Sequence, residues 1–200
     1  MKRLALLTAL IAFSHAAQAE PKTYVIDNGH TSSQFSFNYL GIANQTHRFE
    51  KTSGKVVLDQ DAKTGSAEVT IDATSINTGH TLFNEQMQAA SFFDTAKYPT
   101  ITFKSSKLML DGDQMNLEGD LTIKGITRPV TLTVTQFQCL PNPALKVETC
   151  GANATVTVKR SDFNMGKYAF IASNNVTLNL TIQAIKAQPA MQLANRDPFK

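Results

Sequence analysis

Histidine can act as an acid, a base or a metal ligand, and three histidines, His30, His47 and His80, lie beyond the first 20 positions. Three imidazoles could hold a zinc ion and leave a fourth position for a reacting water. Strong metal motifs place two histidines at i and i+4 or as His-x-His, and no pair here has either spacing. The sequence favours separate histidines in turns and at a helix start, so we predict no metal site and no cofactor.

Nucleophilic catalysis needs a nucleophile, a base and an orienting group within reach of one another. Serines and aspartates are present, but none lies in Gly-x-Ser-x-Gly, and His-Glu-x-x-His does not occur. The two cysteines bound the segment "CLPNPALKVETC", Cys139 to Cys150, whose spacing differs from that of redox pairs and zinc sites. We predict a structural disulfide that joins the ends of a hairpin loop, and a protein that is not an enzyme.

Two side chains are candidates for contact with the polar end of a ligand. His30 is one, and Arg160, in the stretch "VKRSDFNMG", is the other. Arg160 could lie at the mouth of a cavity and meet a polar head group. The competing interpretation pairs Arg160 with Asp162 as an exposed ion pair at a strand end. Exposed ion pairs are common and weak, which favours the second interpretation.

The first 19 residues are typical of a secretory signal peptide. Lys2 and Arg3 precede a short apolar stretch, and "AQA" precedes Glu20, so we predict cleavage after Ala19 and export to the periplasm. A cysteine at the cleavage site would indicate a lipid anchor, and Glu20 stands there instead. Cleavage removes two of the 19 basic residues and none of the 16 acidic ones, which leaves a net charge of +1. Without clustered basic residues we expect no nucleic-acid binding. Without a cysteine at the cleavage site or a later stretch apolar enough to span a bilayer, we expect no stable membrane anchor.

Most of the chain alternates apolar and polar residues with a period of two, the pattern of half-buried strands. "SAEVTIDA", "RPVTLTVTQ" and "NVTLNLTIQA" are clear examples. Turn signals separate the runs, among them "DGD" at 111–113 and "KGITRP" around Gly125. We expect one domain over residues 20–186 with roughly eight to ten strands, arranged as an antiparallel barrel or sandwich. The segment 187–200 has no periodicity and is expected to be a flexible tail.

A single helix is expected in "TGHTLFNEQMQAA", where Leu82, Phe83 and Met87 fall near helical spacing. Thr78 or Thr81 could cap its start. The helix leads directly into "SFFDTAKYPTITF", and we expect Phe92 and Phe93 to anchor it as a lid, with at least one ring facing the interior.

Five blocks of the sequence, in this order, resemble those of the YceI-like, polyisoprenoid-binding family: "HTSSQFSF", "DATSINTGH", "SFFDTAKYPTITF", "GDLTIKGITRPVTL" and "VKRSDFNMG". The resemblance implies an all-β fold: a lipocalin-like extended antiparallel β-barrel of about eight strands with one short helix and an apolar cavity. It also implies binding of a long isoprenoid lipid, such as ubiquinone or a polyprenyl phosphate. The helix of this chain is more apolar than the family pattern, which bears on the choice of ligand.

On this basis we expect a monomer or homodimer that binds an isoprenoid lipid in the periplasm. The residues expected to line its cavity are Phe35, Phe37, Val69, Ile71, Leu82, Phe83, Met87, Phe92, Phe93, Ile101, Phe103, Leu121, Ile123, Leu132 and Val134. Two alternatives stay open. One is a hydrolase of lipid head groups that uses His30 or His80 with a carboxylate, and the other is a barrel filled by its own side chains that works as an interaction module.

Overall fold

The computed structural model describes residues 20–111 and 114–188. The predicted signal peptide, residues 112 and 113 of the predicted "DGD" turn and most of the predicted tail lie outside the described residues. Within the described part the strands are β1 Lys22–Ile26, β2 Ser32–Tyr39, β3 Ala43–Phe49, β4 Thr52–Asp59, β5 Thr64–Asp72, β6 Ile76–Asn77, β7 Thr100–Asp111, β8 Gln114–Ile123, β9 Ile126–Asn142, β10 Val147–Lys159 and β11 Ala172–Lys186. The helices are α1 Thr81–Gln88 and the short 3₁₀ turns η1 Asn28–His30, η2 Ala73–Ser75 and η3 Arg160–Phe163.

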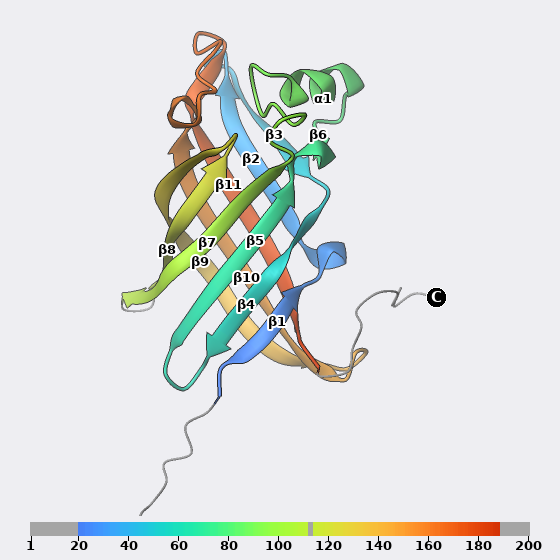
Figure 1. The fold of residues 1–200 in the computed structure, drawn as a ribbon, viewed down its shortest axis with the longest axis vertical. Helices are drawn as coiled ribbons and strands as arrows, with labels where there is room; N and C mark the ends of the chain where they lie inside the picture. The colour runs from blue at the N-terminus through green and yellow to red at the C-terminus, as the bar shows by residue number, and fades with distance from the viewer. Residues whose placement is uncertain (1–19, 112–113, 189–200) are drawn as a thin grey trace, which may run out of the picture.

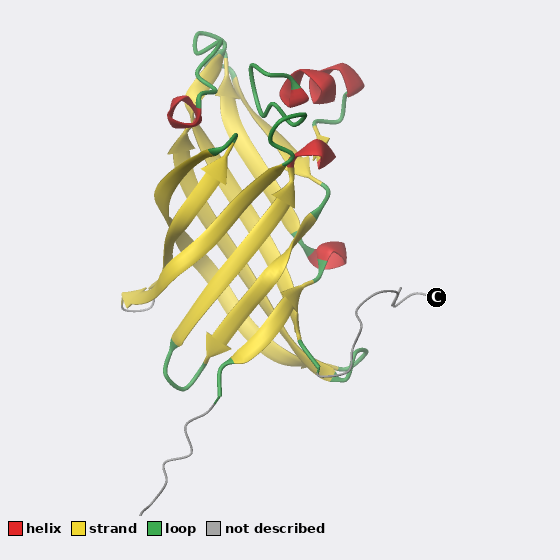
Figure 2. Ribbon diagram, viewed as in Figure 1, coloured by secondary structure: helices red, strands yellow, loops and turns green. Residues whose placement is uncertain are grey.

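Eight of these strands close into an antiparallel barrel (Figures 1 and 2). The order around the ring is β1-β4-β5-β7-β8-β9-β10-β11, and pairing of β1 with β11 closes it. The predicted barrel of about eight strands is therefore confirmed. The described residues hold eleven strands in all, above the expected range, because β2, β3 and β6 extend the sheet from β11.

The long strand β11 explains how the ring and the extension share one sheet. Its C-terminal end, residues 184–186, pairs with β1, while residues 172–181 pair with β2. Its other edge pairs with β10 along nearly its whole length. The barrel is thus closed by β1 at its lower end and walled by β2 and β3 at its upper end, where α1 lies (Figure 1).

The turn between β8 and β9 shows how two sequence blocks meet. Lys124 and Gly125 both have positive φ, 52° and 72°, as a two-residue type I′ hairpin turn requires. Tyr98, from the "KYP" step, packs so closely on Gly125 that a Cβ there would lie 2.6 Å from its ring. The predicted turn at Gly125 is confirmed, and its glycine also makes room for the tyrosine.

The expected helix forms, but its start differs from the prediction. The N-cap of α1 is His80, which makes no side-chain capping bond. The side chain of Asn84 instead reaches back, and its Oδ1 accepts hydrogen bonds from the backbone N–H and the hydroxyl of Thr78, both at 2.8 Å. The expectation that Thr78 or Thr81 caps this helix is wrong, because Thr81 is already the first helical residue and the Thr78 hydroxyl accepts from the N–H of His80 at 3.3 Å rather than from the first turn.

The lower end of the barrel is closed by covalent and polar links. Cys139 and Cys150 form the predicted disulfide between β9 and β10. They are opposite one another in the strand register, and the hairpin continues to Asn142 and Val147 beyond them. The disulfide therefore joins two paired strands rather than the ends of a loop. The fully buried Tyr24 of β1 donates its hydroxyl hydrogen bond to Glu148 of β10.

Candidate functional site: an apolar cavity in the upper barrel

A cavity of about 680 Å³ occupies the upper part of the barrel. Its wall combines inward residues of the barrel strands with residues of β2, β3, α1 and the segments that follow α1 and η3. A volume in this range suits a small-molecule or lipid ligand, since typical ligand pockets measure roughly 300–1,000 Å³. The alternation of the strands explains the wall, because alternate residues of each strand face the same side.

Most residues predicted to line a cavity do so. They are Phe35, Phe37, Val69, Ile71, Phe83, Met87, Phe92, Phe93, Ile101, Phe103, Leu121, Ile123 and Leu132, and Arg160 joins them. Sequence reasoning missed a second apolar set, which consists of Phe49, Val130, Val156, Val158, Phe163, Met165, Tyr168, Ile171, Val176, Leu178 and Leu180. For β9, β10 and β11 the alternation in the sequence held the signal, since each missed valine or leucine shares a face with its neighbours two residues away.

Two predicted lining residues lie elsewhere. Leu82 is 67% exposed on the outer side of α1 and is not part of the cavity wall. Val134 is also absent from the wall, although Val130 and Leu132 of the same strand belong to it. Val134 lies next to a bulge of β9, where residue 135 is inserted between the partners of Ala154 and Asn153.

His30 is not brought to the cavity either. It belongs to η1, outside the barrel wall, where its Nδ1 lies 2.7 Å from Oδ2 of Asp27. Asp27 also accepts the backbone N–H of Gly29 and so caps this short turn. The position of His30 gives it a local structural partner and no path to a ligand in the cavity.

An aromatic cluster forms the centre of the cavity wall. The ring of Phe93 lies 5.7 Å from that of Phe35 and 5.4 Å from that of Phe49, both edge to face. Phe93 is 8% exposed, and its backbone N–H donates to the carbonyl of Met87 at the end of α1. Phe92 and Phe93 both line the cavity, and Phe93 holds the segment after α1 against β2 and β3.

Arg160 is buried, with 6% of its surface exposed, so its interpretation as an exposed ion pair with Asp162 is wrong. Its guanidinium donates to four backbone carbonyls, those of Met165, Lys167, Ala172 and Ser173. These bonds fold the segment that connects η3 to β11 around a cation. Burial lowers the pKa of Arg160, and no carboxylate among the described residues forms an ion pair with it.

Lys124 is a second buried cation, and sequence reasoning missed it. From the turn between β8 and β9 its Nζ donates to the carbonyl of Ala90 at 2.6 Å and to that of Asn164 at 3.1 Å. It therefore ties the segment after α1 to the segment after η3. Neither hydrogen bond of Lys124 could be predicted from the sequence, because a lysine next to a turn glycine is usually exposed.

The cavity wall has one polar side, where β3 faces the start of α1. Gln45, His47, Thr78, His80 and Gln86 lie there. The ring of His47 packs between those of Phe35 and Phe37, at 5.6 and 5.7 Å. Burial lowers the pKa of His47, so its imidazole is neutral at pH 7 and offers one donor and one acceptor.

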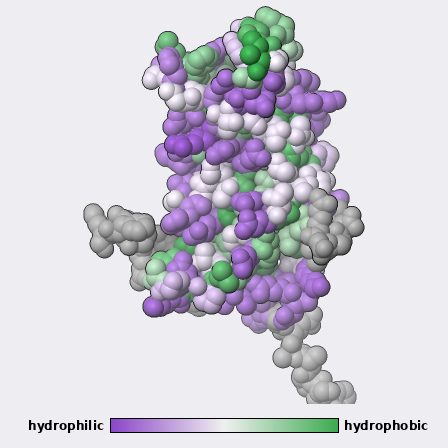
Figure 3. Space-filling model, turned by 180° about the vertical axis from the view of Figure 1, so that it is seen from behind, coloured by the Kyte–Doolittle hydropathy of each residue, from purple (hydrophilic) through white to green (hydrophobic). Residues whose placement is uncertain are grey.

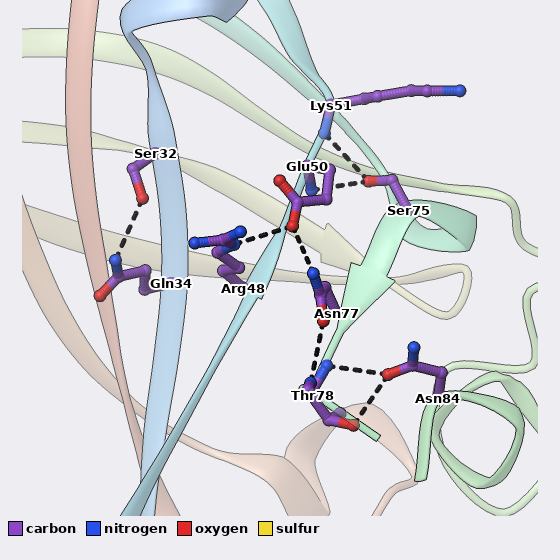
Figure 4. Close-up of polar contacts among 10 residues, drawn as sticks. Ser32, Gln34, Arg48, Glu50, Lys51, Ser75, Asn77, Thr78 and Asn84 are labelled. Carbon is purple, nitrogen blue, oxygen red and sulfur yellow. Dashed lines mark hydrogen bonds and ion pairs between the residues drawn. The ribbon is translucent and has the colours of Figure 1, made fainter. Parts of the chain in front are cut away.

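A network of hydrogen bonds fixes this polar side from outside (Figure 4). Oε1 of Glu50 accepts from Nε of Arg48 at 2.8 Å and from the amide of Asn77 at 2.6 Å. These two donors hold the pKa of Glu50 below its ordinary value. The backbone N–H groups of Glu50 and Lys51 both donate to the hydroxyl of Ser75 at 3.1 Å. The network links β3, η2 and β6 and so sets where α1 begins.

The three histidines do not converge. Within the described residues no three His, Cys, Asp or Glu side chains gather to hold a metal ion. The described wall of the cavity contains no carboxylate either. No helix among the described residues is long and apolar enough to cross a lipid bilayer.

Comparison with known proteins supports a family assignment. The YceI-like domain model matches residues 24–184. The chain belongs to the YceI-like domain family. It is 32% identical to Protein YceI of Escherichia coli O6:H1 over 186 residues, which cover 92% of this chain and 96% of that protein. It is 29% identical to the UPF0312 protein PSPA7_0523 of Pseudomonas paraeruginosa over 92% of this chain and 98% of the relative.

Several solved structures share the fold. The chain is similar to BcnA of Burkholderia cenocepacia with a TM-score of 0.70 and 29% identity, over 79% of this chain and 98% of that one. It is similar to the YCEI protein of Campylobacter jejuni with a TM-score of 0.66 and 25% identity, over 74% and 88% of the two chains. A polyisoprenoid binding domain from Saccharophagus degradans has the same fold, with a TM-score of 0.60, 18% identity and coverage of 82% and 98%.

Proposed function

We propose that this YceI-like protein binds a long-chain isoprenoid lipid, of the ubiquinone or polyprenyl phosphate type, with its apolar tail in the barrel cavity. The observation that carries the proposal is a cavity of about 680 Å³ whose wall is built mainly from aliphatic and aromatic side chains. Each methylene group moved from water into such a wall gains about 0.8 kcal/mol, so a branched hydrocarbon tail is strongly favoured. Met87 and Met165 in the wall can adapt to the shape of a flexible chain.

The polar end of the ligand would lie near the mouth, where the wall offers hydrogen-bonding groups. The neutral imidazole of His47 suits a carbonyl or hydroxyl oxygen. Arg160 lines the cavity as a cation whose bonds to carbonyls leave its charge uncompensated, and it would attract an anionic head group. We retain Arg160 as a proposed head-group contact and drop His30, which lies outside the barrel.

We further propose that the ligand is carried or sequestered in the periplasm. Support comes from the sequence, which begins with a typical signal peptide and is expected to be cleaved after Ala19. The disulfide between Cys139 and Cys150 agrees with an oxidising compartment. The function belongs to the domain of residues 20–186 rather than to the tail.

The two alternatives fit the geometry less well. A hydrolase needs a base and an orienting carboxylate beside the ligand, and the described cavity wall contains histidines but no aspartate or glutamate. A filled barrel predicts no cavity, and the cavity contradicts it. The cavity therefore fits lipid binding better than hydrolysis or a filled barrel.

The proposal is tested by native mass spectrometry and lipid extraction of the protein purified gently from its own periplasm. We expect a bound isoprenoid lipid, or stoichiometric uptake when ubiquinone or a polyprenyl phosphate is added. A protein that is isolated empty and takes up neither lipid would overturn the proposal.

A matched pair of variants places the ligand in the cavity. Val130 lines the cavity, whereas the next residue of β9, Thr131, is exposed. Val130→Trp should fill part of the cavity and weaken uptake about ten-fold or more, which corresponds to the loss of about two buried methylenes. Thr131→Trp adds the same ring outside and should leave uptake unchanged. Equal uptake by both folded variants would show that the ligand binds elsewhere.

A further inference from the structure

Large apolar side chains are exposed at one end of the barrel, around the mouth of the cavity. We define the rim as Tyr39, Leu40, Ile42, Leu82, Phe83 and Phe170, which are between 41% and 80% exposed. Of the large hydrophobic residues exposed in the described part of the chain, only Phe137 and Leu140, on the opposite hairpin, lie outside the rim. Figure 3 shows hydrophobic residues at the upper end of the molecule, and others lower on the same face. Exposed apolar patches of this kind mark interaction sites.

The rim comes from three segments that are tied together. The backbone N–H of Leu40, in the turn between β2 and β3, donates to the carbonyl of Ile171 at 2.7 Å. The ring of Phe92, in the segment after α1, stacks on that of Tyr168 at 6.1 Å. The turn and the segment after η3 are therefore joined directly, and α1, which carries Leu82 and Phe83, is joined to them through the segment that follows it (Figure 1).

The rim and the cavity are continuous. Tyr39 and Phe83 belong to the rim and also line the cavity. Tyr168 and Ile171, which are next to Phe170 in the chain but not part of the rim, line the cavity too. Ile42 and Phe170, each 80% exposed, extend outward from this edge and do not line the cavity. An apolar surface thus runs from the outside of the protein into its interior.

Two residues of this edge have left-handed backbone, as five other non-glycine residues of the described chain do. Leu40 has φ 53° and Tyr168 has φ 62°, in the left-handed region that favours glycine and asparagine. A non-glycine residue held there costs on the order of 1 kcal/mol, and such strain concentrates at functional sites. The turn between β2 and β3 keeps a large apolar residue at a position where asparagine or glycine would be more stable.

We propose that the rim docks the protein reversibly on a lipid bilayer, with Ile42 and Phe170 inserted at the interface and the cavity mouth facing the acyl chains. The choice of a bilayer as the partner rests on the proposed function, because an isoprenoid lipid with a long tail resides in membranes. The cavity would then exchange its ligand without passing the tail through water, which the hydrophobic effect opposes.

Two exposed lysines at this end can meet anionic lipid head groups, and Glu85 of α1 and Asp162 of η3 are exposed on the same elements. Lys167 is exposed beside the rim, with its Nζ 5.0 Å from the ring centroid of Tyr168 and 3.4 Å from the hydroxyl of Ser91. Lys97, in the segment after α1, is also exposed, next to Tyr98. Aromatic and aliphatic side chains flanked by lysines are typical of surfaces that bind at a membrane interface.

The test is flotation of the purified protein with vesicles of phosphatidylethanolamine and phosphatidylglycerol. We expect the parent protein to float with the vesicles and the double variant Ile42→Ser, Phe170→Ser to bind at least about ten-fold more weakly, because two large apolar contacts are lost. The matched control is Phe137→Ser, Leu140→Ser, which removes the exposed apolar residues of the opposite hairpin and should float like the parent. A parent protein that does not float, or equal loss in both double variants, would overturn the proposal.

Two further measurements separate this inference from the proposed function. A soluble, fluorescent short-chain prenyl probe should enter the cavity of the rim variant as it enters the parent, since neither changed residue lines the cavity. A parent that floats yet takes up no probe keeps the docking surface and removes the cavity function. Analytical ultracentrifugation gives the oligomeric state, and a dimer that the rim substitutions dissociate would show that a second copy, not a bilayer, covers the rim.

Discussion

The two ends of the barrel are built by different means. At the lower end, β1 pairs with both β4 and β11, the disulfide joins β9 to β10, and Tyr24 bonds to Glu148. At the upper end, three segments meet around a cavity, and the long side chains of Arg160 and Lys124 hold two of them by their carbonyls. Strand pairing and the disulfide close the lower end of the barrel. Side chains that reach from the wall can fix the other end while leaving it hollow.

This difference separates stability from binding. The lower end contains few residues that a ligand could reach, so changes there should alter stability alone. The upper end combines packing with a cavity, so changes there should alter binding as well. Three substitutions or treatments test this separation.

The largest effect is expected for Phe93→Asp at the upper end. Phe93 is 8% exposed among Phe35 and Phe49, so the new carboxylate would be buried without a partner. A charge buried in this way costs about 4 kcal/mol or more, and we expect an unfolded protein or a cavity that no longer binds lipid. Chemical denaturation and lipid uptake are the measurements. The control Phe93→Leu should fold and bind, and a folded, lipid-binding Phe93→Asp protein would show that the ring is not needed in the wall.

A smaller effect, on stability alone, is expected at the lower end. Loss of the disulfide between Cys139 and Cys150 should destabilise the fold by about 2–3 kcal/mol, because the unfolded chain gains entropy when the loop is no longer closed. Lipid uptake of the folded protein should not change. The double variant Cys139→Ala, Cys150→Ala can be compared with the parent by denaturant titration with and without reductant. Unchanged stability with both thiols free, or lost uptake at unchanged stability, would contradict the separation of the two ends.

The smallest effect concerns pH and the polar side of the cavity. Burial lowers the pKa of His47 from its ordinary value of 6.5, so the folded protein takes up this proton less readily than the unfolded chain. The contribution of a neutral His47 to stability is therefore complete above pH 6.5 and decreases as the pH falls below that value. Thermal unfolding of the parent and of His47→Gln at about pH 7.5 and about pH 5 measures it. We expect the variant to lose less stability on acidification, and parallel losses would show that the imidazole is not buried in solution.

Much of this architecture could be predicted from local patterns. The Lys124–Gly125 turn and the inward faces of β5, β7 and β8 follow from alternation and turn residues. The hydrogen-bond partners of Arg160 and Lys124 could not be predicted, because they are backbone carbonyls, 5 to 13 residues from Arg160 and 34 and 40 residues from Lys124. Any segment of sequence offers such carbonyls, so no residue type marks them in advance.

From the sequence alone one could predict the family and, through that resemblance, a barrel of about eight strands, together with the single helix, the cysteine pair and about half of the apolar wall. The wall residues could be predicted because period-two alternation sorts side chains by face whatever the strand order. Only the folded structure shows the extent of the cavity, whose wall does not include Val134. It also shows which side of α1 faces the cavity, and Leu82 lies on the other side. It also placed His47 between Phe35 and Phe37 and gathered the rim around the mouth. These outcomes depend on which strands become neighbours and where a bulge falls, and a one-residue shift in register reverses the face of every residue beyond it.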